Sequence, residues 1–487
     1  MSKLPYHDLR SFVELARQID EFRVIEHADW NCEIGALSEV TAELIPEPPL
    51  LLFDRIKDYP AGYRIVSLLL GSFKRTALAW GLATDLPKME FVRQAAHKVR
   101  DAKPIAPVEI PTGPVMDNVL TGGAVDLWKF PAPRYHARDG GRYIGTGDTV
   151  LQRDPLTGYI NMATYRMQVH EKNLLGLWMS PGQHGRQICQ RYWDQGKACP
   201  VVATFGQDPL TFMASHTKIP LGQSELDYLG GLRGGPLEVI RGPITGLPIN
   251  AYAEIAIEGE IPPPSEEARE EGPFGEWPGY YAGGTIGTGE RQPVIRVKAI
   301  YHRNDPIIMD AAPLWPGASP RAMPIEAGIL WNQLESAGIQ DIVGVSMFGE
   351  NHYMWVVAIR QRYGGHARQT GLAVLGCAMA ARHGRYVVIV DEDIDPTNLK
   401  EVLWAMQTRV DPASDIQIVD GTWSSPLDPR MSPDKRAAGD YTNSRAIFYA
   451  VRPFAWRDKF PPVSRAEPEL RQQIIEKYRS VMSFPRQ

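Results

Sequence analysis

INAYAEIAIEGEI, residues 249–261, alternates apolar with mostly polar side chains. The apolar side chains stand at every second position from the start: Ile249, Ala251, Ala253, Ile255 and Ile257. An alternation of period two is typical of a strand with one buried face, so we expect a half-buried strand here. PVIRVKAIYH, residues 293–302, predicts another strand. Glycine and proline separate such runs between about residues 115 and 310, which indicates a β-barrel or β-sandwich.

The first residues of the chain predict an amphipathic helix. Asp8 is suited to cap it. Its apolar side chains fall on one face at helical spacing: Leu9, Phe12, Val13, Ala16 and Ile19. A short strand-like segment follows, and mixed helix and strand signals continue to about residue 100, which favours an α/β unit.

The last third of the chain also predicts an α/β unit. YVVIVDEDIDP, residues 386–396, holds an uninterrupted apolar run, which is typical of a parallel strand buried on both faces. A helix should follow, with a shared apolar face made by Leu399, Val402, Leu403 and Met406. Residues 465–483 predict a weakly amphipathic helix, which could dock onto another subunit or lie on the surface.

Two proline-rich segments, residues 101–115 and 311–324, divide these sections. We therefore predict a mixed α/β (α+β) protein of three domains: an N-terminal α/β domain (1–110), a central β-barrel domain (111–312) and a C-terminal α/β domain with a helical tail (313–487). The segment near residue 315 would act as a hinge beside the active cleft.

Composition excludes several classes of partner. The 487-residue chain has a net charge of −5, so it lacks the basic surface of a nucleic-acid-binding protein. No apolar run approaches the length that crosses a bilayer, and the start lacks the apolar core of a secretory signal. The four cysteines form no CxxC pair, which argues against a disulfide framework or a zinc site and favours the cytoplasm.

EGPFGEWPGYY, residues 271–281, carries the strongest chemical signal. Glu271 and Glu276 flank a Gly-Pro-Phe-Gly turn, and two carboxyl groups on a shaped loop suit general acid/base chemistry. The alternative is a solvated acidic loop, because residues 265–277 contain five glutamates. Four aromatic residues could wall the site or simply pack: Phe274, Trp277, Tyr280 and Tyr281.

YINMATYRMQVHEKN, residues 159–173, predicts a strand with polar side chains on one face: Thr164, Arg166, Gln168 and His170. Asn161 lies an odd number of residues from Arg166, so a regular strand would point them to opposite faces. A bulge or a ligand wrapped around the strand could bring both to one site. The glycine clusters at residues 141–147 and 283–289 lack phosphate-loop order, and we predict turns for both.

Together these segments resemble the UbiD family of prenylated-flavin-dependent decarboxylases over essentially the whole chain. The resemblance rests on residues 271–281, on the N-x4-R spacing of Asn161 and Arg166, and on residues 386–412. It implies a catalytic trio of Arg166, Glu271 and Glu276. It also implies that the central barrel is a split β-barrel that binds flavin.

The same resemblance implies the cofactor contacts. A divalent cation, Mn²⁺ or Mg²⁺, would be held by Asn161, His184 and Glu225, and such a ligand set suits a hard cation. Glu238 competes with Glu225 for this role, and the local sequence favours Glu225. K⁺ near the flavin phosphate is implied by the family alone. Further flavin contacts would come from Thr164, Tyr165, Arg166, Gln183 and Arg385, the last at a position where some relatives carry lysine.

The function implied by the resemblance is reversible, non-oxidative decarboxylation of an aromatic, heteroaromatic or α,β-unsaturated acid. Prenylated FMN would accept the electron pair, Glu276 would donate the proton, and Arg166 would pair with Glu271. A flavin prenyltransferase would supply the cofactor, and the chain would form a homodimer or larger homo-oligomer. The alternatives are a conventional FMN-dependent oxidoreductase and a non-catalytic subunit of a multi-component carboxylase.

Overall fold

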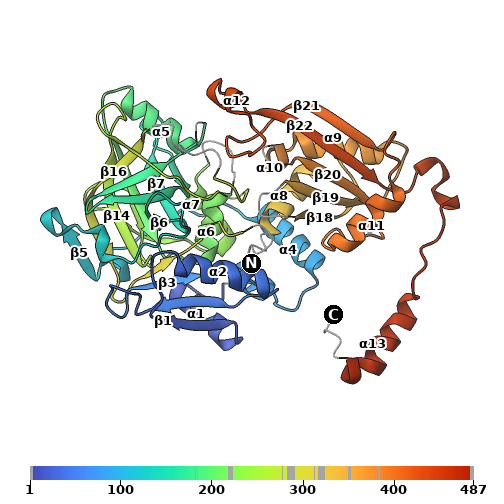
Figure 1. Cartoon of the computed structure of the whole chain (residues 1–487), viewed down its shortest axis with the longest axis horizontal. Helices are drawn as coiled ribbons and strands as arrows, with labels where there is room; N and C mark the ends of the chain where they lie inside the picture. Colours follow the sequence, from blue (N-terminus) through green and yellow to red (C-terminus); the bar gives the residue numbers. More distant parts are fainter. Residues whose placement is uncertain are drawn as a thin grey trace.

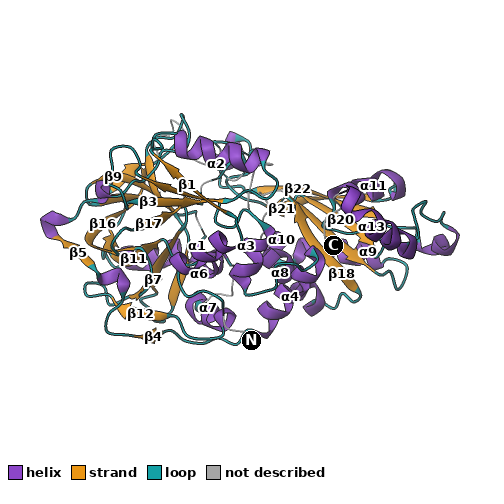
Figure 2. Cartoon of the chain, turned by 90° about the horizontal axis from the view of Figure 1, so that it is seen from below, coloured by secondary structure: helices purple, strands orange, loops and turns teal. Residues whose placement is uncertain are grey.

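The computed structural model describes residues 4–180, 182–217, 223–276, 278–281, 291–311, 313–315, 324–348, 353–381 and 384–482. Its helices and strands form three successive parts along the chain: in Figure 1 the N-terminal elements lie below the large central sheet, and the C-terminal sheet lies to the right of both. In the turned view the C-terminal sheet again lies to one side of the two other sheets (Figure 2). Among the described residues, no helix is both long and apolar enough to span a membrane. The mixed helix and strand content confirms the predicted fold class.

The N-terminal part is a four-stranded sheet with helices around it. Its elements are α1 (Leu9–Gln18), β1 (Phe22–Glu26), α2 (Glu33–Leu44), β2 (Leu50–Asp54), β3 (Arg64–Ser67), α3 (Phe73–Trp80) and α4 (Lys88–Asp101). The Asp8 side chain caps α1 by accepting from Ser11 N, as predicted. The sheet order is β1-β2-β3-β17, and β17 (Ile307–Met309) comes from the end of the central segment. The central segment therefore returns to the N-terminal sheet, and the domain boundaries stay a prediction.

The central part is a curled ten-stranded sheet. Its main path runs through β6 (Arg142–Gly145), β9 (Arg166–Glu171), β10 (Leu174–Trp178), β16 (Arg291–His302), β14 (Ile255–Ile261), β11 (Cys199–Phe205), β7 (Asp148–Arg153) and β8 (Ile160–Ala163). Both β5 (Asn118–Thr121) and β15 (Ala268–Glu270) also pair with β16. A small sheet beside it contains β4 (Val108–Glu109), β12 (Glu238–Arg241) and β13 (Pro248–Asn250).

Short helices fill the connections of this part. They are η1 (Pro114–Met116), η2 (Gly122–Ala124), η3 (Leu127–Lys129), α5 (His184–Trp193), α6 (Pro209–His216) and α7 (Glu225–Arg233). The first glycine cluster, residues 141–147, forms β6 and the bend before β7, so it precedes a strand and not a helix. The second cluster, residues 283–289, lies outside the described residues.

The single half-buried strand predicted for residues 249–261 is wrong. The chain there forms the end of β13 and then β14, and the two strands belong to different sheets. Strand β14 is buried almost throughout, and even Glu258 is fully enclosed. Its carboxylate accepts from Thr245 N at 2.7 Å and from Tyr301 Oη at 2.7 Å. These buried hydrogen bonds allow a polar residue to occupy what the alternation alone assigns to solvent.

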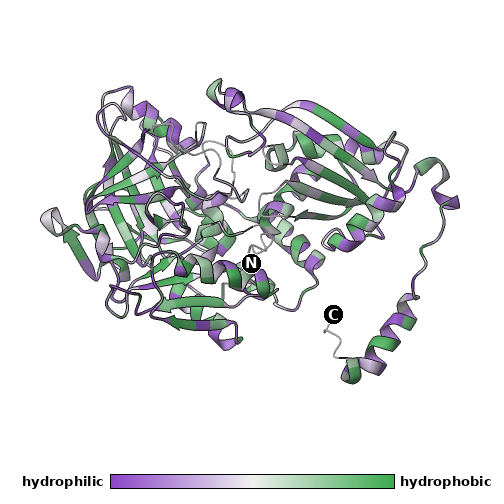
Figure 3. Cartoon of the chain, in the orientation of Figure 1, coloured by the Kyte–Doolittle hydropathy of each residue, from purple (hydrophilic) through white to green (hydrophobic). Residues whose placement is uncertain are grey.

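The C-terminal part is a five-stranded sheet of order β18-β19-β20-β22-β21. The strands are β18 (Ile342–Phe348), β19 (Met354–Ile359), β20 (Tyr386–Asp391), β21 (Ile416–Trp423) and β22 (Thr442–Ala450). Strand β20 pairs in parallel with β19 and β22, which confirms the predicted buried parallel strand. Most apolar residues of β19 and β20 are buried, and these strands are coloured as hydrophobic in Figure 3, whereas Ile418 and Trp423 of β21 are exposed.

The helices of this part are α8 (Pro324–Ser336), α9 (His366–Gly376), α10 (Ala378–Ala381), α11 (Leu399–Arg409), α12 (Pro433–Ala437), η4 (Phe454–Lys459) and α13 (Pro468–Met482). Helices α9 and α11 both contact β20 and β22, and they pack on opposite faces of the sheet. The predicted face of α11 is partly wrong, because Leu399 and Leu403 are exposed while Val402 and Ala405 are buried. Helix α13 is present as predicted and stands away from the sheet (Figure 1).

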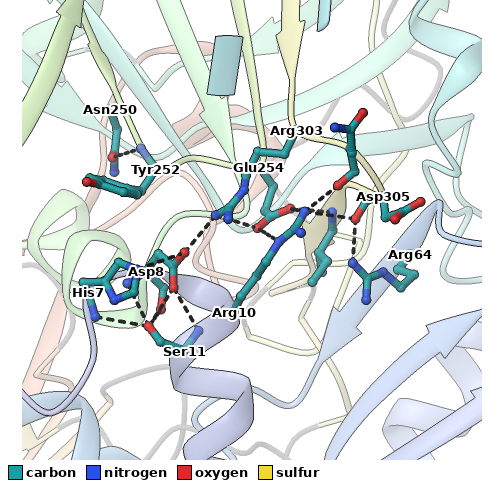
Figure 4. Close-up of polar contacts among 12 residues, drawn as sticks. His7, Asp8, Arg10, Ser11, Arg64, Asn250, Tyr252, Glu254, Arg303 and Asp305 are labelled. Atoms are coloured by element: carbon teal, nitrogen blue, oxygen red, sulfur yellow. Dashed lines mark hydrogen bonds and ion pairs between the residues drawn. The ribbon is translucent and has the colours of Figure 1, made fainter. Parts of the chain in front are cut away.

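A buried ionic network joins the N-terminal helix to the central sheet (Figure 4). Arg10 of α1 donates through Nε and Nη2 to the two carboxylate oxygens of Glu254, at 2.8 and 2.7 Å. Arg303, after β16, donates to Asp8 Oδ2 at 2.8 Å and lies 3.3 Å from Glu254 Oε1. Glu254 is fully buried, so its charge depends on these two guanidinium groups.

Replacing Glu254 with glutamine should weaken this connection between α1 and the central sheet. The variant removes the charge that faces two arginines, and we expect it to lower the free energy of unfolding by about 2–3 kcal/mol. Urea unfolding followed by tryptophan fluorescence measures the change. The matched control is Glu14→Gln, because Glu14 makes only an exposed pair with Arg17 at 3.4 Å. That control should stay within about 0.5 kcal/mol of the parent chain. Equal midpoints for both variants would contradict the structural role of Glu254.

Candidate active site

Arg166 lies between two buried carboxyl groups. It is the first residue of β9, and its Nε and Nη2 donate to Oε1 and Oε2 of Glu271 at 2.7 and 2.6 Å. Its Nη1 donates to Oε1 of Glu276. The three residues are no more than 9% exposed. The structure therefore brings the predicted catalytic trio together, and it excludes the alternative of a solvated acidic loop for Glu271 and Glu276.

The charges of this trio do not balance if both glutamates are ionised. Burial raises the pKa of Glu276 above the usual glutamate value; Arg166 opposes this rise and the charge of Glu271 adds to it. Burial also works against the Arg166 charge, but the two carboxylates raise the pKa of Arg166 above its usual value. A permanent guanidinium, an ionised Glu271 and a protonated Glu276 form a neutral group, so Glu276 can hold a transferable proton.

Residues outside the loop that carries both glutamates hold it in place through hydrogen bonds to its backbone. Gln168, two residues after Arg166 on the same strand, accepts from Gly272 N at 2.9 Å. Gly140 N donates to Pro273 O at 2.8 Å, and a side chain at position 140 would clash with Gly272 O at 1.8 Å. Tyr281 donates to Asp139 at 3.0 Å. Close contact between residues 139–140 and this loop therefore fixes where Glu271 and Glu276 point.

Aromatic rings enclose the guanidinium of Arg166. Its carbon Cζ lies 4.9 Å from the centroid of Trp178 and 5.0 Å from that of Phe274. Phe274 in turn packs on Tyr143, with ring centroids 4.3 Å apart. Of the other predicted wall residues, Tyr280 is exposed and Trp277 lies outside the described residues. Contact with ring faces stabilises a cation in a site that excludes water.

A second group of polar residues lies at the start of two helices. His184 is the first residue of α5 and Glu225 the first of α7, and both helices contact β8, the strand that carries Asn161. Tyr159 Oη lies 3.1 and 3.2 Å from the carboxylate oxygens of Glu225 and 3.5 Å from Asn161 Oδ1. Met162 N donates to Glu225 Oε2 at 3.0 Å. Asn161 and Glu225 are therefore neighbours.

His184 reaches the same region through α5. Gly185, the second residue of α5, packs closely against Gln152 and Tyr165. A Cβ added at Gly185 would lie 2.4 Å from both Gln152 Oε1 and Tyr165 Oη. Gln152 is the direct partner of Asn161 in the β7–β8 ladder. The beginning of α5 thus sits on the strand pair that presents Asn161, which brings all three predicted metal ligands to one side of the sheet.

The donor set fits a hard divalent cation. Burial raises the pKa of Glu225 to about 7, and no lysine or arginine pairs with it among the described residues. Asn161 Nδ2 is buried without a hydrogen-bond partner in the described structure. Burial lowers the pKa of His184, which keeps its imidazole neutral and able to bind a metal. No cluster of three His, Cys, Asp or Glu side chains occurs in the described parts of the chain, because one ligand here is an amide.

Glu238, the competing candidate ligand, lies elsewhere. It begins β12 in the small sheet, where it pairs with β4 and β13. Its contact with Tyr252 raises the pKa of that tyrosine. The geometry around Asn161 therefore favours Glu225.

The remaining predicted cofactor residues divide into two sets. Thr164 donates to Asp148 O at 2.8 Å, Tyr165 N donates to Asp148 Oδ1 at 3.2 Å, and Gln183 precedes α5, so these three lie near the other site residues. Arg385 does not. It pairs with Asp428 and lies 4.6 Å over the ring of Tyr353, all within the C-terminal part.

The structure also corrects the strand predicted for residues 159–173. Strand β8 ends at Ala163 and β9 begins at Arg166, and the two pair with different neighbours. This corner removes the restriction that a regular strand would place on Asn161 and Arg166. Sequence reasoning missed Tyr159, which touches both Asn161 and Glu225. Its position two residues before Asn161, just ahead of β8, is the signal that could have found it.

The protonation state of Glu276 can be observed directly. We expect a protonated carboxyl band in the infrared spectrum at neutral pH, and this band should disappear as the pH rises through the raised pKa of Glu276. The Glu276→Gln variant should lack this component of the band, whereas the components from Glu225 and Asp148, whose pKa values burial also raises, should remain. In the control Glu270→Gln, an exposed glutamate of β15 is changed and the band should remain. A spectrum in which Glu276 titrates like a solvated glutamate would contradict this charge arrangement.

Three family models match the chain in order. The models are those of the 3-octaprenyl-4-hydroxybenzoate carboxy-lyase: its N-terminal domain matches residues 13–99, its Rift-related domain residues 107–315, and its C-terminal domain residues 322–450. Their order and extent agree with a three-part architecture across most of the chain.

Individual proteins are similar over nearly the full length. A phenolic acid decarboxylase of Streptomyces sp. (strain D7) is 31% identical and covers 93% of each chain. A pyrrole-2-carboxylic acid decarboxylase of Pseudomonas aeruginosa is 31% identical and covers 89% of each. Among solved structures, the UbiD-class enzyme HmfF of Pelotomaculum thermopropionicum in complex with FMN has a TM-score of 0.83 at 26% identity, covering 97% of this chain and 100% of that one.

Proposed function

Because this chain belongs to the UbiD family of carboxy-lyases, we propose that it reversibly decarboxylates an aromatic or heteroaromatic carboxylic acid without net oxidation, using prenylated FMN. The relatives that act on phenolic and pyrrole acids favour this substrate class over a non-aromatic unsaturated acid. The observation that carries the proposal is the buried trio, in which Arg166 bridges Glu271 and a glutamate suited to hold a proton.

The reaction consumes one proton for each carboxylate that leaves as carbon dioxide. When bound, prenylated FMN supplies an electrophilic centre that accepts the electron pair of the broken bond. Glu276 then donates its proton to the carbon that carried the carboxylate, and it regains a proton from solvent before the next turnover. In the carboxylation direction the ionised Glu276 accepts the proton of that carbon.

Arg166 and Glu271 prepare the site for this transfer. Two hydrogen bonds from Arg166 hold the Glu271 carboxylate, and the negative charge of Glu271 in turn favours a proton on Glu276. The Trp178 and Phe274 rings exclude water around the guanidinium. Exclusion of water strengthens these interactions and directs the proton to the substrate carbon.

The second group would hold the cofactor phosphate. Asn161, His184 and Glu225 would hold Mn²⁺ or Mg²⁺, which would supply positive charge for the cofactor phosphate. The start of α5, which has no side-chain cap, also suits a phosphate. Thr164, Tyr165 and Gln183 would complete the flavin contacts. We further propose K⁺ near the same phosphate, and Arg385 would reach the cofactor only if the C-terminal part moves toward the central sheet.

The cellular setting follows from the cofactor. We propose a homodimer or larger homo-oligomer in the cytoplasm, supplied with cofactor by a separate flavin prenyltransferase. All four cysteines are free, which supports a reducing compartment.

Co-expression with a flavin prenyltransferase, followed by assays with phenolic and heteroaromatic acids, tests the proposed reaction. We expect carbon dioxide release without NAD(P)H, and deuterium from the solvent at the vacated carbon. Glu276→Gln should retain flavin yet lose turnover about a thousandfold, because general acid catalysis is lost. The control Glu270→Gln should keep near-normal rates. Oxidation of NAD(P)H by the FMN-loaded chain, with no decarboxylation, would identify a conventional oxidoreductase. Inactivity of the loaded chain without further subunits would indicate a carboxylase component.

The proposed metal group predicts a separate phenotype. His184→Ala should lower the bound manganese or magnesium, measured by elemental analysis, and should reduce flavin retention on gel filtration. The control His97→Ala changes an exposed histidine of α4 and should keep both. Unchanged metal content and an unchanged flavin spectrum in His184→Ala would remove His184 from the site.

A further inference from the structure

A series of polar contacts leads from the loop of the two glutamates, residues 271–281, to the N-terminal part. The last residue of this loop, Tyr281, donates to Asp139 Oδ1 at 3.0 Å. The side chain of Asp139 is fully buried, and its Oδ2 lies 3.8 Å from His136 Nδ1. The other ring nitrogen of His136, Nε2, lies 3.3 Å from Oε2 of Glu39. Glu39 belongs to α2, so four side chains connect the loop to a helix of the N-terminal part.

The Tyr281 end of this series acts directly on the backbone of Glu276. Glu276 N donates to Tyr280 O at 3.0 Å, and Gly279 N donates to Glu276 O at 2.8 Å. Tyr281 follows this turn at once, so its bond to Asp139 anchors the turn from which the Glu276 side chain projects. Burial and the nearby Asp139 charge raise the pKa of Tyr281, so its phenol keeps the proton that it donates.

Glu271, at the other end of the loop, has a different support. Gly272 follows Glu271 directly, and its N donates to Gln168 Oε1 at 2.9 Å. Gln168 lies on β9, so this support comes from the central sheet. Each end of the loop therefore has a support of its own. Loss of the bond to Asp139 should displace Glu276 and leave Glu271 in place.

Residues 134–139, which carry the middle of the series, rest on the N-terminal part. Cys32 N donates to Arg134 O at 2.7 Å. A Cβ added at Gly35 would lie 2.4 Å from Tyr135 O, so the start of α2 touches the backbone of this segment. Backbone contacts this close leave the segment little freedom to move relative to α2. The position of α2 is thereby passed on to the loop of the two glutamates.

We propose that Asp139, His136 and Glu39 are positioning residues of the reaction, because they hold Tyr281, and through it Glu276, against α2. The inference rests on the proposed function, in which Glu276 donates the proton. Hydrogen bonds to a carboxylate fix direction as well as distance, and a misplacement of about 1 Å can lower a rate about a hundredfold. The N-terminal part, which supplies none of the catalytic trio, thereby contributes to the rate.

Tyr281→Phe tests the end of the series next to Glu276. The variant removes only the O–H that reaches Asp139, and we expect kcat to fall about tenfold while KM changes less than about twofold. The assay uses the phenolic or heteroaromatic acid that the parent chain turns over fastest. In the cofactor-free chain, the infrared component of Glu276 should disappear at a lower pH than in the parent, because a displaced carboxyl group is less buried. The control Tyr478→Phe changes an exposed tyrosine of α13 and should leave both measurements unchanged.

Glu39→Ala tests the far end of the series. It removes the oxygen that faces His136 and that also accepts from Trp315 N at 3.1 Å. We expect kcat to fall about threefold, with the infrared component of the proton donor shifted as in the tyrosine variant. Glu43→Ala changes an exposed glutamate of the same helix and should behave as the parent. His136→Gln keeps an N–H donor for Glu39 and should also behave as the parent, whereas His136→Ala should match Glu39→Ala.

Two results would overturn the inference. The first is a Tyr281→Phe variant with the kcat and the infrared titration of the parent, since the bond to Asp139 would then not position Glu276. The second is equal behaviour of Glu39→Ala and Glu43→Ala, since α2 would then take no part. Failure of the proposed reaction is distinguishable from both, because the infrared measurement needs neither cofactor nor substrate. A chain that decarboxylates no acid would reject the proposed reaction, and a shifted component in Tyr281→Phe would still establish how Glu276 is held.

Discussion

One guanidinium shared by two buried carboxyl groups is the constraint on which the reaction centre depends. Arg166 satisfies Glu271 with two hydrogen bonds and still reaches Glu276, yet a single positive charge cannot balance two negative ones in an interior without water. The excess must be removed by a proton, and Glu276 is the residue whose pKa is raised. In the proposed function this glutamate would be the stored acid, and the fold provides it without any unusual functional group.

Keeping these charges in place requires rigid supports from distant parts of the chain. Arg166 and Gln168 lie on the same strand, and Gln168 holds the backbone of the loop that carries both glutamates. At the opposite end of the molecule's central sheet, Glu254 ties the N-terminal helix to the loop after β16 through Arg10 and Arg303. Both supports use charged or amide groups with defined geometry, which fix position better than apolar contacts do.

The sequence predicted the features that depend on local pattern. The cap at Asp8, the parallel strand β20 and the trio of Arg166, Glu271 and Glu276 are all present. Prediction from the sequence failed where contacts between residues far apart along the chain determine the structure. The alternation at residues 249–261 looks like one strand, but burial of Glu254 and Glu258 by partners far along the chain divides it between two sheets. Likewise, the corner between β8 and β9 is invisible to residue spacing, and no local signal tells that Arg385 is engaged by Asp428.

Two buried carboxyl groups of the candidate sites lack a full counter-charge, and the proposed function gives each a different partner. The extra negative charge beside Arg166 would be relieved by a proton on Glu276, which would give the site its acid. The carboxylate of Glu225, with a neutral imidazole and an amide nearby, would be relieved by a cation, which would anchor the cofactor. The buried guanidinium of Arg409, by contrast, is paired with Asp391, so its charge is balanced within the chain. A buried charge without a partner of its own therefore marks where this molecule would meet other chemistry.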